Sequence, residues 1–345
     1  MRSPDDSQLR MVPSLVRELD PGTFAFVMAT GIVSTALLAE GATVVSAILL
    51  VIGIAGYLVL LLASGYRLVR WPRRMLDDFA GPRGFSFLAF VAGTNVLVSR
   101  LTIAGYVTVA MVLLAIGILG WLVLGYGVPL ALITGRRHQR GLDQVNGMWF
   151  LWVVAIQSVA VASGTLAGEV DLVVLPVLAS VCWAIGLVLY PVIATLVLAR
   201  LMLRPITPAQ LMPAYWIFMG ACAITVLAGA TVVNMPAHTV LPESMVLGMS
   251  FVQWSFCTWL LPVLLGLGVW RHVINRYPWR YETGLWGMVF PIGMYGVASH
   301  RLGRASGAEW LSDFGNGEGW VAVGVWLAVM LTVLLKARRL LRHSR

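Results

Sequence analysis

The sequence predicts an all-α integral membrane protein of ten transmembrane helices, arranged as five quasi-repeated helical hairpins around a central pore lined by the odd-numbered helices. Three observations lead to this fold class. Hydrophobic residues make up 59% of the 345 residues and charged residues only 11%, with a mean hydropathy of +0.86, which excludes an ordinary soluble domain. Leucine content alternates from one apolar span to the next, and alternate spans begin at nearly constant intervals.

Ten apolar stretches are candidates for helices that cross the roughly 30 Å of hydrocarbon, for which about 20 residues are needed. In chain order they are 22–39, 43–66, 85–99, 101–134, 147–167, 172–199, 213–234, 244–270, 284–299 and 320–335. The two shortest, 85–99 and 284–299, need flanking residues to reach the required length.

The leucine counts of these ten spans are 2, 6, 2, 8, 2, 7, 1, 6, 1 and 4. The odd spans hold 8 leucines in 92 residues, and the even spans hold 31 in 129. Lipid accepts leucine readily, whereas helix contacts and water-filled paths favour Gly, Ala, Ser and Thr. We therefore expect the odd helices to face protein or a pore and the even helices to face lipid.

The odd spans begin near residues 22, 85, 147, 213 and 284, at intervals of 63, 62, 66 and 71 residues. A repeat of this size predicts a recurring hairpin unit. Aromatic residues recur at the start of each odd span, as in Gly22-Thr-Phe-Ala-Phe26 and Tyr215-Trp-Ile-Phe218. They fit either an interfacial aromatic belt or pore-lining side chains.

The basic residues indicate how the chain is oriented. With a cytoplasmic N-terminus, 21 of the 24 Lys and Arg residues fall on the cytoplasmic side, so the positive-inside rule predicts an even number of spans and cytoplasmic termini. The net charge of +9 is then a topology signal and does not indicate nucleic acid. The predicted organisation is an N-terminal cytoplasmic arm at 1–20, a membrane domain at 21–335 and a basic tail at 336–345.

The interiors of the spans carry no charged residue, which argues against a proton pump or a cation carrier and favours an anion. Uncharged side chains on the odd spans are the candidates for the pore lining, although an interhelical hydrogen bond accounts for Asn95 and Gln157 equally well. The outer-side residues Arg100 and Arg301 either attract anions or are boundary residues that snorkel. The pore-lining candidates are Phe26, Thr30, Ser34, Phe87, Thr94, Asn95, Gln157, Ser158, Phe218, Cys222, Thr225, Trp286 and Ser299.

Enzymatic chemistry finds little support in this sequence. No histidine pair is placed to hold haem or metal within the bilayer, and no catalytic triad, carboxylate pair or phosphate-binding loop occurs within a span. Cys182, Cys222 and Cys257 lack CxxC spacing and fit packing positions. We therefore expect no catalytic residue, no metal and no cofactor.

Three segments resemble the tellurite-resistance/dicarboxylate transporter family, which includes malate permeases, sulfite exporters and slow-type anion channels. They are Pro21-Gly-Thr-Phe-Ala-Phe-Val-Met-Ala-Thr-Gly31, Trp149 to Ser158 and Leu285-Trp-Gly-Met-Val-Phe-Pro-Ile-Gly-Met-Tyr295. The resemblance extends over 21–335. It implies ten helices as five hairpins, a pore lined by the odd helices, and a homotrimer in a plasma membrane, here a bacterial one.

The resemblance also implies a gate, because family members place a phenylalanine of the ninth helix across the pore. Phe290 matches it four residues after Trp286, and Pro291, which follows directly, can kink the helix there. The predicted function is transport of small anions such as chloride, nitrate, sulfite, tellurite or a dicarboxylate. A proton-coupled C4-dicarboxylate (malate) carrier or a sulfite exporter is the alternative. A non-transporting membrane scaffold or a quinone-binding subunit is the alternative from a different class.

Overall fold

A computed structural model describes residues 16–135, 141–235 and 241–343, and in these ranges all regular secondary structure is helical. Five helices are largely buried: α2 (Ala25–Ala39), α5 (Leu88–Ile103), α7 (Leu151–Leu166), α9 (Ile217–Val233) and α11 (Trp286–Ser306). Five longer helices surround them: α3 (Thr43–Arg70), α6 (Val107–Thr134), α8 (Val174–Leu203), α10 (Glu243–Val269) and α13 (Glu318–His343). The short helix α4 (Pro72–Phe79) connects the first two hairpins, α12 (Glu309–Gly315) lies in the turn between α11 and α13, and a π-helical turn at Trp270–Ile274 extends α10.

Nine helical segments of the described ranges are long and apolar enough to cross a membrane. α11 is not among them, although it has 21 residues, because glycines, Pro291 and the polar pair His300 and Arg301 lower its hydropathy. The described residues therefore form the all-helical fold of a multi-pass membrane protein. α11 nevertheless continues to Ser306, seven residues beyond the predicted span, and stops where Gly307 adopts a left-handed backbone (φ +71°).

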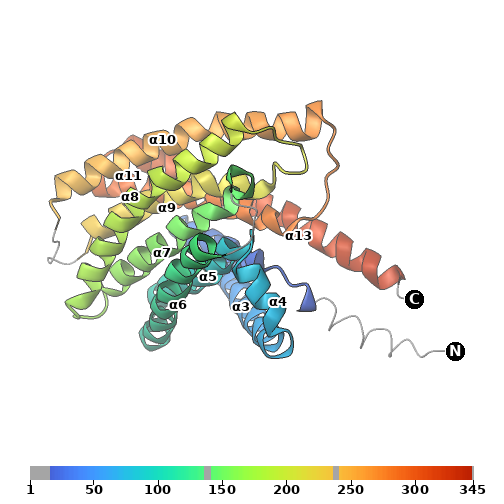
Figure 1. Cartoon of the computed structure of the whole chain (residues 1–345). Coiled ribbons are helices and arrows are strands. Elements are labelled where there is room, and N and C mark those ends of the chain that lie inside the picture. The colour runs from blue at the N-terminus through green and yellow to red at the C-terminus, as the bar shows by residue number, and fades with distance from the viewer. Residues whose placement is uncertain (1–15, 136–140, 236–240, 344–345) are drawn as a thin grey trace.

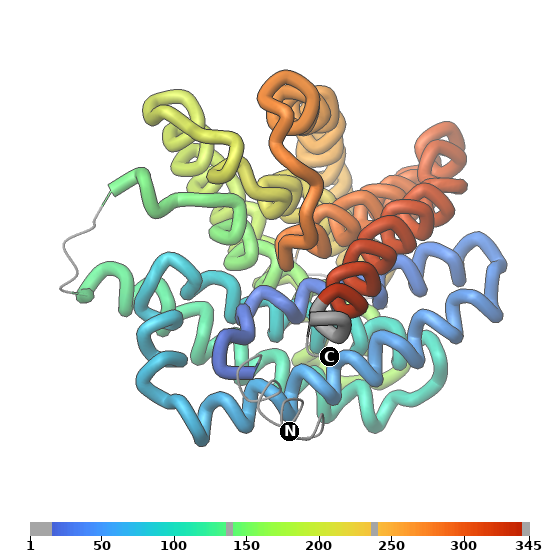
Figure 2. Tube along the Cα trace, turned by 90° about the vertical axis from the view of Figure 1, so that its right-hand side faces the viewer, coloured from blue at the N-terminus to red at the C-terminus, as the bar shows by residue number. Residues whose placement is uncertain are grey.

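The five buried helices close into a ring. α2 packs on α5, α5 on α7, α7 on α9, α9 on α11, and α11 returns to α2. Figure 1 shows this ring from the side, and Figure 2, turned by 90°, shows the hairpins arranged around a common centre. Helices distant in sequence, such as α11 and α2, are therefore direct neighbours.

Each outer helix packs on its own hairpin partner and on the next inner helix. Thus α6 contacts α5 and α7, and α13 contacts α11 and α2. In the most apolar stretch of each candidate span, 72% to 83% of residues are buried for α2, α5, α7 and α9, against 17% to 39% for the outer helices. This contrast is the one that leucine alternation predicts, since most leucines of the outer helices are exposed or half-buried.

Every inner helix begins with a 3₁₀ turn, and these turns form a second, smaller ring. They are Pro21–Phe24, Gly84–Phe87, Gly147–Phe150, Pro213–Trp216 and Thr283–Leu285, and each contacts the turn on either side of it. The approach is close enough that a Cβ added at Gly147 would lie 2.6 Å from Cα of Tyr215. The recurrence of small residues at these starts is the structural basis of the sequence repeat.

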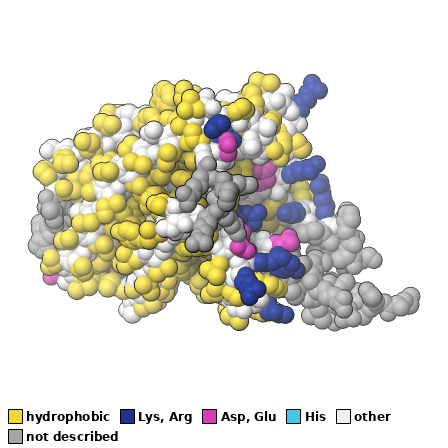
Figure 3. All heavy atoms as spheres, viewed as in Figure 1, with side chains coloured by type: hydrophobic (Ala, Val, Ile, Leu, Met, Phe, Trp, Pro, Cys, Tyr) yellow, Lys and Arg dark blue, Asp and Glu magenta, His cyan; other side chains and the backbone are white. Residues whose placement is uncertain are grey.

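The basic residues gather at the end of the molecule where these 3₁₀ turns lie. Figure 3 shows most of the visible Lys and Arg side chains at this end, with an apolar surface over the rest of that face. Buried arginines there pair with acidic side chains: Arg67 Nη2 lies 2.5 Å from Asp78 Oδ2, and Arg271 Nη2 lies 2.6 Å from Glu282 Oε1. The first inner helix starts and α13 ends at this same end (Figure 1), as an even number of crossings requires.

Other predicted boundaries also differ from the structure. Leu101 to Ile103 complete α5 and do not open the next helix, because Gly105 (φ +85°) makes the turn. Residues 336–343, predicted as a tail, continue α13, and the predicted arm lies largely outside the described residues.

Candidate transport pathway

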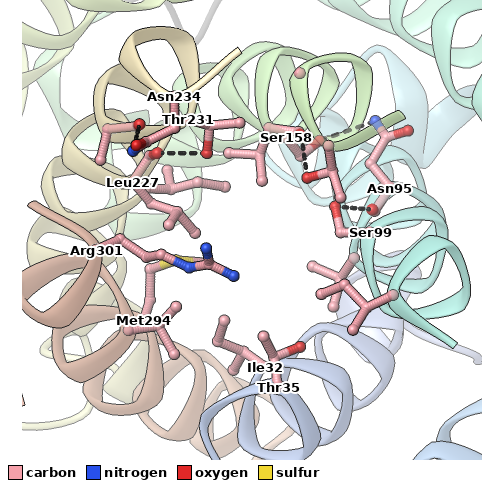
Figure 4. A pocket seen from close by; sticks show the side chains of 18 of the residues that line it. Ile32, Thr35, Asn95, Ser99, Ser158, Leu227, Thr231, Asn234, Met294 and Arg301 are labelled. Atoms are coloured by element: carbon pink, nitrogen blue, oxygen red, sulfur yellow. Dashed lines mark hydrogen bonds between the residues drawn. The ribbon is translucent and has the colours of Figure 1, made fainter. Parts of the chain in front are cut away.

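A cavity of about 230 Å³ opens on the ring axis at the end opposite the 3₁₀ turns (Figure 4). All five inner helices contribute to its wall. Its lining residues are Ile32, Thr35, Asn95, Val96, Ser99, Ile103, Ser158, Val161, Gly164, Thr165, Gly168, Ile224, Leu227, Ala230, Thr231, Asn234, Met294, Val297 and Arg301. A site that five sequentially distant helices share on one axis has the position of a transport vestibule.

The wall of the cavity is neutral apart from one residue. Its polar groups are hydroxyls and two amides, it contains no carboxylate, and Arg301 is its single charged member. Thr35, Ser99 and Thr231 donate their hydroxyl protons to carbonyls one turn back, at 3.0, 3.2 and 2.8 Å. The hydroxyl oxygens therefore present lone pairs, and most of the donor capacity facing the cavity belongs to Arg301.

The cavity ends above an apolar layer. Five residues, one from each inner helix, lie four positions before a cavity-lining residue and thus one turn deeper on the same helix face. They are Met28, Ala92, Val154, Gly220 and Phe290. The four that carry side chains are at most 1% exposed, so solvent does not reach them.

Phe290 supplies the largest side chain of this layer. It is 0% exposed and shares a helix face with the cavity residues Met294, Val297 and Arg301. Its ring rests against α9 where Gly220 leaves room, since a Cβ at Gly220 would be 3.4 Å from Cδ1 of Phe290. Proline follows at 291 and also contacts Gly220, so both residues depend on this glycine.

Two of the predicted pore-lining residues, Asn95 and Ser158, line the cavity, and the Asn95 amide donates to the Ser158 hydroxyl at 3.0 Å. The structure directs several other hydroxyls toward the outer helices. Trp326 Nε1 donates to Thr30 (3.0 Å), Trp254 Nε1 donates to Ser299 (2.9 Å), and the Tyr57 and Thr94 hydroxyls are bonded at 2.9 Å. Ser34 bonds to Ser46 of α3, and the Gln157 amide donates to the carbonyl of Trp183.

The remaining predicted residues pack between helices. Phe26 meets Trp286 edge to face at 5.0 Å, Phe87 meets Phe79 at 5.9 Å, and Phe218 stacks on Phe150 at 4.5 Å. The Cys222 thiol donates to the carbonyl of Gln253. The Thr225 hydroxyl donates to Ala221, and its carbonyl accepts from Trp183 Nε1.

Sequence reasoning missed much of the cavity wall, including Thr35, Ser99, Thr165, Thr231 and Asn234. A signal for part of it exists, since Asn95 and Ser99 are four residues apart and Ser158 and Thr165 seven, each pair on one helix face. Within the described ranges, no group of three or more His, Cys, Asp or Glu side chains is placed to hold a metal ion.

Comparison with known proteins gives consistent results. The family model described as "Voltage-dependent anion channel" matches residues 18–334. An uncharacterized membrane protein of Mycobacterium tuberculosis is 47% identical over 148 residues, covering 42% of this chain and 75% of that protein. An uncharacterized transporter of Methanocaldococcus jannaschii is 22% identical over 335 residues, covering 94% of this chain and 96% of that protein. A second transporter of that organism is 24% identical over 195 residues, covering 55% of each chain.

Proposed function

Because the chain belongs to the voltage-dependent anion channel family, we propose that it carries small anions along the axis of its five inner helices, with Phe290 as the constriction. Membership agrees with the resemblance seen in the sequence and makes the protein a transporter or channel rather than an enzyme. Anion transport in general follows from the family. The route, the gate and the substrate are our proposal.

The observation that carries the proposal is the axial cavity, to which all five inner helices contribute and which ends at an apolar layer. An anion can enter a neutral vestibule with no carboxylate to repel it. It cannot pass the layer below, because apolar side chains remove its hydration without replacing it. Rotation of the Phe290 side chain, or movement of α11 at Pro291, would open this step.

The rest of the arrangement follows from the same proposal. Ten helices including α11 cross the plasma membrane as five hairpins, with both termini on the basic, cytoplasmic side. The cavity then faces outward. We retain the homotrimer that the family resemblance implies, in which exposed leucine-rich faces of the outer helices meet lipid or a neighbouring subunit.

A proton-coupled C4-dicarboxylate carrier is the second candidate, and sulfite or tellurite export fits the same pathway. A coupled carrier needs a titratable group on the route. The wall of the cavity contains no carboxylate and no histidine, and its one ionisable side chain is an arginine. We therefore prefer uncoupled passage of anions to proton-coupled transport.

The test is anion flux through purified protein in liposomes, with wild type and Phe290→Ala compared under chloride, nitrate, sulfite and malate at two proton gradients. Phe251→Ala is the matched control, since Phe251 is 43% exposed on the outer helix α10. We expect F290A to raise the flux at least tenfold and F251A to leave it unchanged. A folded F290A protein with wild-type flux would refute the gate, and proton-dependent malate uptake without chloride flux would favour the coupled carrier.

A further inference from the structure

We infer that the guanidinium of Arg301 is an anion-binding subsite in the axial cavity, and that it selects small oxyanions over halides. The inference rests on the proposed function, since it names the class of anion that the pathway receives first. In Figure 4 the side chain of Arg301 extends from α11 into the open centre of the cavity.

Arg301 differs from the other arginines that turn toward the protein. Arg67, Arg200 and Arg271 each lie within 4.0 Å of an acidic side chain, at 2.5, 3.8 and 2.6 Å. Arg100 is bonded to the hydroxyls of Ser34 and Ser46. Arg301 has neither an ion pair nor a hydrogen bond with a protein group among the described residues, so its N–H donors are open to solvent and to ions in the cavity. Arg301 is exposed and its charge faces the open cavity, so the guanidinium attracts anions that enter there.

Arg301 holds most of the free hydrogen-bond donors that face the cavity. The Thr35, Ser99 and Thr231 hydroxyls have committed their protons to carbonyls, and Asn234 Nδ2 donates to the carbonyl of Ala230 at 2.7 Å. The guanidinium offers five N–H donors in a planar fork, whose spacing matches two oxygens of one anion. A spherical halide cannot use both arms of the fork as well. Planar or carboxylate-like oxyanions, of which nitrate is the simplest probe, are therefore preferred.

The position on α11 relates this subsite to the constriction. Arg301 lies 11 residues after Phe290 on the same helix face, which is roughly 16 Å along the axis at 1.5 Å per residue. An anion bound at Arg301 therefore lies inside the cavity and has not yet reached the apolar layer. Permeation requires that it leave again, so we expect millimolar affinity and saturation of the flux at millimolar concentrations.

The experiment uses the full chain with Arg301→Gln, Arg301→Lys and the control Arg304→Gln, whose side chain is exposed on α11 outside the cavity wall. Binding is measured first by ³⁵Cl line broadening in detergent solution, with displacement by nitrate or bromide. Flux against nitrate and chloride concentration in liposomes is measured second. We expect R301Q to abolish the displaceable broadening and to raise the half-saturating nitrate concentration about tenfold, with R304Q unchanged.

R301K separates charge from geometry. It should still bind chloride while losing the preference for nitrate over bromide, because an ammonium group lacks the fork. Wild-type broadening in R301Q would overturn the subsite, and an undiminished nitrate preference in R301K would overturn the selection of oxyanions. If wild-type protein carries no anion at all, the proposed function fails, and the binding measurement still decides the role of Arg301.

Discussion

The hydrogen bond between Trp326 of α13 and Thr30 of α2 gives a direct test of how the two layers are held together. Trp326 Nε1 lies 3.0 Å from Thr30 Oγ1, and the two residues are 7% and 0% exposed. Thr30→Val keeps the volume of the side chain and removes the acceptor, which leaves a buried indole N–H without a partner. Trp326→Phe removes the donor.

The magnitude follows from what such bonds contribute within membranes, about 0.6 kcal/mol on average and up to about 1.7 kcal/mol. Because this bond has ordinary length and both partners are buried, we expect a coupling of about 1 kcal/mol in the double-mutant cycle. The assay is reversible unfolding in mixed micelles, followed by circular dichroism. Trp259→Phe, on an exposed face of α10, should show no coupling to T30V.

The same variant tests which way Thr30 faces. Since its hydroxyl is held against Trp326 and is absent from the cavity wall, T30V should leave anion selectivity unchanged. A coupling energy near zero would show that the layers are not joined here. A change of selectivity in T30V would show that this hydroxyl lines the pathway, and either result would refute the reasoning.

Two further predictions concern the end of the bundle where the 3₁₀ turns lie. Gly147→Ala should lower the free energy of unfolding by roughly 2 kcal/mol or more, because the new Cβ would collide with the backbone of Ala214 and Tyr215. Gly65→Ala, which has open space around it, should change the free energy of unfolding by no more than about 0.5 kcal/mol in the same assay. Glu282→Gln should cost about 1–2 kcal/mol, because it removes the charge that faces the buried Arg271 at 2.6 Å, while the exposed Glu309→Gln should be neutral. If G147A were as stable as G65A, or E282Q as stable as E309Q, the close approach of the turns or the contribution of the ion pair would be refuted.

Much of the fold could be predicted from the sequence because the bilayer imposes length and burial on every span. Leucine alternation identifies the buried helices, since lipid-facing and protein-facing surfaces need different side chains. The boundary of α11 could not be predicted this way. His300 and Arg301 end the apolar pattern, yet the helix continues to Ser306, because its polar last turns reach the cavity and the surface.

The candidate site was harder to predict because an inner helix is buried on all sides. Small and apolar residues surround it, so hydrophobic periodicity does not show which face meets the axis. Thr30, Thr94 and Ser299 are therefore indistinguishable in sequence from Ser99 or Thr231. Their direction is set by aromatic donors on the outer helices, Trp326, Tyr57 and Trp254, which come from distant parts of the chain.

The central claim is that anions travel inside the ring of five helices, and substituted-cysteine labelling along the axis tests it most directly. Val297→Cys places a thiol in the cavity wall, and Ile48→Cys places one on an exposed face of α3 (Ile48 is 53% exposed), while the three native cysteines are buried. The reagent is the negatively charged sulfonatoethyl methanethiosulfonate, added on the cavity side. We predict that it modifies V297C and blocks the anion flux through this variant, and that nitrate slows the modification. Flux through I48C should be unaffected. Unblocked flux through fully modified V297C would contradict the axial pathway.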